Sequence, residues 1–132
     1  MNRLLCIALL AGALLTGVSC GGGDSTGSGP GTLKVRLTAP PANADSAILI
    51  TISGPVAPTS ATAAIGLRLF QSSAGTTTRY ALIGPLANGA TILTIGVADV
   101  GAFSQYHGSV DGVAQANYQL RAVNAYALAI TR

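Results

Sequence analysis

Few side chains in this sequence could support catalysis. His107 is the only histidine, and the acidic residues are four aspartates with no glutamate. Nucleophilic catalysis would need His107 as a general base beside Ser104 or Ser109, with Asp99 or Asp111 orienting its ring. No nucleophile elbow surrounds either serine, and the residues around the histidine are typical of the end of a strand. We therefore expect His107 to be an exposed or half-buried strand residue, and a hydrolase that uses His107 is the alternative.

The same inventory is poor in metal ligands. A zinc site takes three or four protein donors, which one histidine cannot supply without several converging carboxylates. Asp45, Asp99 and Asp111 stand in apparent turns, without the alternating acidic loop of an EF-hand. The sequence therefore predicts no catalytic residues, no metal site and no cofactor.

The N-terminus is typical of a secretory signal. Arg3 precedes residues 4–18, an apolar stretch broken only by small residues and one threonine. A helix of that length covers roughly 22 Å at about 1.5 Å per residue, which is short of the about 30 Å hydrocarbon core of a bilayer. We expect residues 1–19 to form a signal peptide rather than a permanent span.

The apolar run ends at Gly17-Val18-Ser19-Cys20, which resembles the lipobox of bacterial lipoproteins. Val18, Ser19 and Cys20 match that pattern, whereas Gly17 stands where the family usually has a branched aliphatic residue. Gly17 and Ser19 also satisfy the small-x-small rule of ordinary signal-peptidase cleavage, which leaves a soluble secreted protein as the alternative.

Cysteine usage favours the lipoprotein interpretation. Cys6 would leave with the signal, so Cys20 would be the only thiol of the exported chain and could form no internal disulfide. The resemblance implies acylation of Cys20 by diacylglycerol, with membrane lipid as a partner, and two or more acyl chains anchor a protein stably. Gly21 after the cysteine, rather than aspartate, implies the outer membrane where the cell has one, so the localisation we expect is the cell envelope.

Residues 20–31 form the predicted linker. Between the cysteine and Gly31 they contain glycine, serine, threonine, one aspartate and one proline, with no large apolar side chain to bury. A flexible linker of this length has a mean reach of about 18 Å. We expect it to hold a folded domain of residues 32–132 clear of the membrane.

The remaining residues alternate between apolar and polar or contain continuous β-branched runs, which indicates strands. Leu33, Val35 and Leu37 alternate with Lys34 and Arg36 in what we expect to be an edge strand, and residues 47–53 are the best candidate for a central strand. Further strands are predicted over residues 59–63, 67–71, 77–83, 90–97, 102–110 and 126–131. Residues 113–121 fit a helical turn or a strand equally well.

Seven or eight short strands without a helix of ten residues predict an all-β fold. We expect an antiparallel β-sandwich, Ig-like or jelly-roll-like, with a small closed barrel as the second choice.

The formal charge of +3 falls to +2 without the signal peptide, which is too low for nucleic-acid binding. The tyrosines could line an interface, although most are expected in the core. The expected function is non-catalytic binding, assembly or structure, with an envelope protein or glycan as partner.

Overall fold

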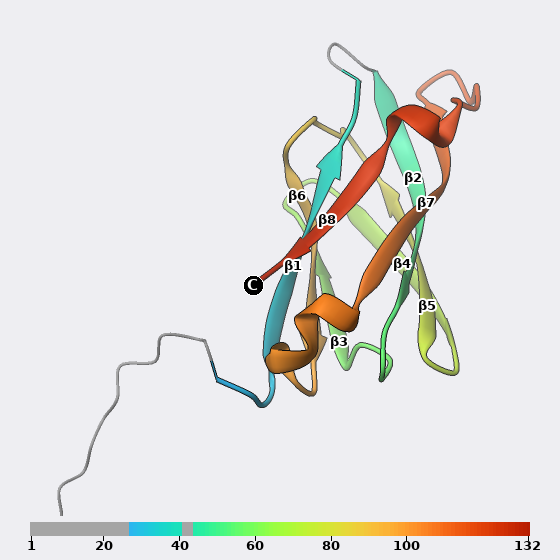
Figure 1. The fold of residues 1–132 in the computed structure, drawn as a ribbon. Coiled ribbons are helices and arrows are strands. Elements are labelled where there is room, and N and C mark those ends of the chain that lie inside the picture. The colour runs from blue at the N-terminus through green and yellow to red at the C-terminus, as the bar shows by residue number, and fades with distance from the viewer. Residues whose placement is uncertain (1–26, 41–43) are drawn as a thin grey trace, which may run out of the picture.

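The computed structural model describes residues 27–40 and 44–132. In this part of the chain, two four-stranded antiparallel sheets pack against each other (Figure 1). The predicted all-β sandwich is therefore confirmed. The expected signal peptide of residues 1–19 and Cys20 lie outside the described residues.

The two sheets are named here by their strand order. Sheet A has the order β3-β6-β1-β8, and sheet B has the order β4-β5-β2-β7. The strands are β1 (Gly31–Thr38), β2 (Asp45–Ser53), β3 (Ser60–Ala63), β4 (Arg68–Ala74), β5 (Thr77–Ile83), β6 (Thr91–Val97), β7 (His107–Gln115) and β8 (Ala127–Thr131). Two short 3-10 helices, η1 (Val100–Gln105) and η2 (Val123–Ala125), precede β7 and β8.

The core lies between the sheets and follows the predicted alternation. On β1, Leu33, Val35 and Leu37 are fully buried while Lys34 and Arg36 are exposed. Most of the remaining core consists of inward side chains of β2, β5 and β6: Ile48, Ile50, Ile52, Tyr80, Leu82, Ile92, Leu93, Ile95 and Val97. Burial of aliphatic side chains at about 1.5–3 kcal/mol each is the main force that holds the two sheets together.

The prediction that β1 is an edge strand is wrong. β1 lies between β6 and β8, whereas β2 is interior to sheet B as expected. The alternation of Lys34 and Arg36 with apolar residues shows that one face is buried, but it carries no information about how many neighbours the strand has. The neighbours are set by chain segments far from β1 in sequence.

Two predicted boundaries in the second half of the chain are also wrong. The strand expected over residues 102–110 is replaced at its start by η1, because the Asp99 carboxylate caps this helix by accepting from the Gly101 N–H at 2.8 Å. β7 then continues through Asp111 and Gly112, where a turn was expected, by means of a register shift opposite Leu49 and Ile50. The undecided segment 113–121 starts as strand and leaves β7 after Gln115.

The hairpin between β4 and β5 is tighter than predicted. The strands predicted over 67–71 and 77–83 left residues 72–76 as the connection, but β4 continues to Ala74, which pairs with Thr77. Only Gly75 and Thr76 form the turn, and Gly75 has a φ of 62°. Glycine adopts this left-handed conformation without steric cost, so a two-residue turn is available here.

A buried carboxylate joins the two sheets at one end of the sandwich. The side chain of Asp45, at the start of β2 in sheet B, is fully inaccessible and accepts a hydrogen bond from the Tyr126 hydroxyl, just before β8 in sheet A. Arg121 donates to the other oxygen of Asp45 at 3.2 Å. Asp45 was expected in a turn; instead it begins a strand, and its carboxylate is paired with two residues of the segment between β7 and β8.

We predict that Tyr126→Phe lowers the free energy of unfolding by about 1.5–3 kcal/mol, because it removes a hydrogen bond to a buried charged group. Urea denaturation of parent and variant measures the difference. Tyr118→Phe is the matched control, since Tyr118 is 93% exposed and removal of its hydroxyl should change the free energy of unfolding by less than about 0.5 kcal/mol.

The hydrogen bond between Tyr126 and Asp45 also predicts that the free energy of unfolding depends on pH. Burial and the Asp45 carboxylate raise the pKa of Tyr126 from 10.0 to about 12. Because the folded pKa is the higher one, the stabilisation is complete below pH 10 and is lost as the pH rises towards 12. The stability difference between parent and Tyr126→Phe should shrink over that interval. A constant difference would contradict the assignment.

Candidate functional site

The outer faces of the two sheets differ in chemistry. The outer face of sheet A is polar along β1, where Thr32, Lys34, Arg36 and Thr38 are exposed. Its neighbours in sheet A add further threonines, such as Thr94 opposite Lys34. A polar outer face is the ordinary complement of a buried inner one.

The outer face of sheet B is apolar over half of its length. Leu49, Ile83 and Phe70 point outward from three different strands and are 39%, 46% and 52% exposed. Ala47 and Ala81 lie between them on the same face, and Gly112 and Ala114 lie beyond Leu49 and Ala47 on β7. We call this set, together with Leu120, the outer apolar surface. The other half of the face is polar, with Thr51, Ser53, Ser109 and His107.

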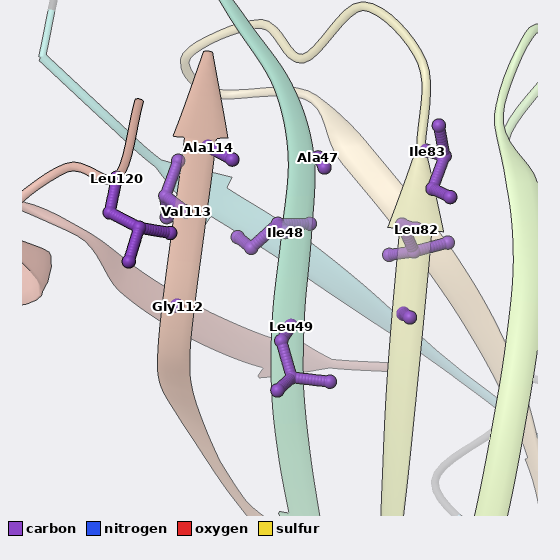
Figure 2. Close-up of a pocket in the computed structure, with 10 residues that line it drawn as sticks. Ala47, Ile48, Leu49, Leu82, Ile83, Gly112, Val113, Ala114 and Leu120 are labelled. Atoms are coloured by element: carbon purple, nitrogen blue, oxygen red, sulfur yellow. The ribbon is translucent and has the colours of Figure 1, made fainter. Parts of the chain in front are cut away.

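The outer apolar surface contains a groove of about 350 Å³ (Figure 2). Three neighbouring strands, β7, β2 and β5, form its floor, and small residues keep that floor low. A Cβ atom added at Gly112 would meet no atom within 4 Å, so the space directly above it is open. Leu120, which is 83% exposed, lies on the loop beside β7 and forms part of the wall.

Two further hollows adjoin this groove. One, of about 270 Å³, shares Leu49 and Ala81 with the groove and extends it to Phe70 on β4. The other, of about 580 Å³, shares Ile83 and extends it over the end of the sheet to Tyr118. We call the groove and these two neighbouring hollows, whose accessible lining is mostly apolar, the apolar track. Apolar tracks of this kind are typical of binding surfaces in soluble domains.

Positive charge borders the track. Arg68 lies over the ring of Phe70, with 5.8 Å between the guanidinium carbon and the ring centroid, and Arg79 lines the hollow next to it. The nearest carboxylate on this face, that of Asp111, accepts hydrogen bonds from Thr51 and Ser109 at the polar end. An apolar ligand with a negative group at the β4 side would complement this arrangement.

The loop between β7 and η2 supplies the most exposed part of the site. Tyr118 has a φ of 66° and is 93% exposed. The loop is held against the edge of β7, because the Gln115 N–H donates to the Gln119 carbonyl and the Arg121 N–H donates to the Val113 carbonyl. The pattern of residues 113–121 did not predict this loop or its place at the site, although two large apolar residues in a polar turn are a usable signal.

His107 occupies the first position of β7 and is exposed, as the strand interpretation predicts. In the described part of the chain, no hydrogen bond joins it to Ser104 or Ser109. Ser109 instead donates to Asp111 at 3.4 Å, on the same open face of the strand. The structure therefore brings one serine and one aspartate of the hypothetical triad together, and leaves the imidazole apart from them.

Asp99 serves a structural purpose far from the groove. Its carboxylate accepts from the N–H groups of Gly29 and Gly101, at 2.9 and 2.8 Å, and these two hydrogen bonds lower its pKa. Over residues 27–40 and 44–132, no group of three or more potential ligands could hold a metal ion. Within those ranges, no helix is long and apolar enough to cross a membrane.

Three of the four tyrosines are buried and one is not. Tyr80, Tyr106 and Tyr126 belong to the core, and the Tyr106 hydroxyl donates to the Val56 carbonyl at 3.1 Å. Only Tyr118 lies beside the candidate site. The expectation that most tyrosines are in the core is confirmed.

Comparisons with known proteins add no assignment. No protein-family model matches the chain, and no curated protein or solved structure shows significant similarity to it.

We predict that adjacent residues on β5 differ sharply in their contribution to stability. Leu82→Ala should cost about 2–5 kcal/mol, because Leu82 is fully buried. Ile83→Ala should cost no more than about 1 kcal/mol, because nearly half of Ile83 is exposed. Urea denaturation measures both. Equal losses would mean that the fold itself requires the outer apolar surface.

Proposed function

We propose that this chain is a non-catalytic binding module of the bacterial cell envelope, anchored by lipid on Cys20, which binds another envelope protein through the outer apolar surface. The observation that carries the binding proposal is the collection of exposed aliphatic and aromatic side chains on one half of sheet B. The proposed partner presents an apolar segment with negative charge near Arg68 and Arg79.

The difference between the two sheets supports this proposal. Both sheets bury one face, and the outer face of sheet A is polar along β1. Folding alone therefore does not require the outward-facing Leu49, Phe70 and Ile83 to be apolar. Large apolar side chains left in water are unfavourable for solubility, and a partner that covers them would recover about 25 cal/mol per Å² of apolar area.

The position of the N-terminal segment also supports it. Gly31 pairs with Val97 at one end of the sandwich, and Gly29 is held there by Asp99. Figure 1 shows that the two ends of β1 lie at opposite ends of the sandwich. Thr38, at the far end of β1, pairs with Ala127, which follows Tyr126 and its hydrogen bond to Asp45. Ala47, close to Asp45 on β2, lines the groove. A chain anchored through the residues before Gly29 would present the outer apolar surface at the end remote from its attachment.

The binding proposal is tested with a photo-crosslinking amino acid placed at Leu120 or Leu49 of the full chain in whole cells. Both positions should yield the same discrete adduct, and Gly112→Leu should reduce it at least about fivefold by filling the groove. The matched control is Val56, which is 52% exposed but does not line the groove. Equal labelling from Val56, or no adduct from either leucine, would contradict the proposal.

The anchor is tested separately by intact mass spectrometry of the chain extracted from membranes. We expect the mature chain to begin at Cys20 and to carry a mass increase that corresponds to diacylglycerol and a further acyl group. Cys20→Ser should lack this mass and leave the membrane fraction. A mature parent chain without acyl chains would support ordinary secretion instead.

A further inference from the structure

The outer edge of β4 is an unpaired seven-residue strand edge. β4 is the last strand of sheet B and pairs along its whole length with β5. The backbone hydrogen bonds of the described residues include none from Arg68–Ala74 to a strand on the other side. β4 contains no proline, and its one charged residue, Arg68, is at its start.

The register identifies the backbone groups that face outward. Ala74 and Thr77 flank a two-residue turn, and such a pair exchanges hydrogen bonds. Because hydrogen-bonded pairs alternate along an antiparallel ladder, Ser72 and Phe70 also bond to β5. Leu69, Gln71 and Ser73 therefore direct their N–H and C=O groups to the free edge. The same alternation on β5 agrees with the bond from the Gly84 N–H to the Ser46 carbonyl at 2.8 Å.

The other strand edges are shorter or covered. β3 has four residues and follows Pro58 closely. β7 has a register shift at Asp111, and the following loop bonds to its end through Arg121. β8 packs at the corner with β7, where Gly108 approaches Leu128 closely. Among the described edge strands, β4 is seven residues long with no register shift, no proline within it or just before it and no loop bonded to it, and such an edge is a template for pairing with another strand.

We propose that two copies of this chain pair through β4 in an antiparallel arrangement centred on Gln71. In this register Gln71 faces Gln71 of the second copy, and Leu69 faces Ser73. Each of these pairs exchanges two backbone hydrogen bonds, so every outward group of Leu69, Gln71 and Ser73 is satisfied.

The side chains also fit this register. Phe70 lies opposite Ser72 of the second copy and diagonal to the other Phe70, within reach of an aromatic contact. Arg68 lies opposite the uncharged Ala74, so no like charges face each other. The two copies then form one eight-stranded sheet with the outer apolar surfaces on the same side. This pairing does not depend on the proposed envelope function.

Disulfide trapping tests the register in the full chain in detergent solution. Two Gln71 Cα atoms would be about 5.5 Å apart, within the span of a disulfide, whereas two Ser73 Cα atoms would be roughly 14 Å apart. Under mild oxidation, Gln71→Cys should give a covalent dimer that a reductant separates. Ser73→Cys should give no more covalent dimer than the parent chain, which reports the background from any native thiol.

Sedimentation equilibrium tests the dimer without an added thiol. Gln71→Pro removes an N–H that β5 does not use, and it should raise the dimer dissociation constant about tenfold or more with an unchanged circular dichroism spectrum. A parent chain that stays monomeric, a folded Gln71→Pro variant that dimerises as well as the parent, or equal trapping at positions 71 and 73 would overturn the proposal. A dimer whose groove yields no photo-adduct would count against the binding proposal alone.

Discussion

A β-sandwich buries one face of each sheet, and this constraint explains most of the sequence. Most inward residues of β1, β2 and β5 are aliphatic or aromatic because they meet the opposite sheet, with Asp45 and Thr78 as the buried polar exceptions. The outward residues are free of that requirement. On β1 that freedom is used for Lys34 and Arg36. On sheet B the outward positions carry Leu49, Phe70 and Ile83, whose side chains are not part of the core. The apolar outer face is therefore the feature that calls for a functional explanation.

The second constraint is the buried Asp45 carboxylate. A carboxylate shielded from water must be paired. Tyr126 and Arg121, both in the segment between β7 and β8, donate hydrogen bonds to the Asp45 carboxylate. That pairing fixes the path of the loop that carries Tyr118 and Leu120. The position of Leu120 in the wall of the groove thus depends on the hydrogen bonds of the buried Asp45. The same hydrogen bonds link the start of β2 in sheet B to the residue before β8 in sheet A.

The sequence predicts strands well and strand order poorly, for physical reasons. Alternation around Val35 and the β-branched run around Ile50 reveal one or two buried faces, which are local properties. The place of β1 between β6 and β8 results from pairings with residues more than fifty positions away. The candidate site is harder still, because Leu49, Phe70 and Leu120 look like core residues until the pleat and the neighbouring strands decide which side they occupy. The bulge at Asp111 is likewise invisible to local propensity, since Asp-Gly is a strong turn signal.

The free edge of β4 and the outer apolar surface adjoin each other, and this proximity limits how each can be used. Phe70 projects from the edge strand onto the outer face, so a strand added at β4 would lengthen the apolar track rather than cover it. Covering the track requires a partner that lies across the strands, over Leu49 and Ile83. Edge pairing and face binding are therefore compatible on the same sheet: the first uses backbone groups in the plane of the sheet, and the second uses side chains perpendicular to it.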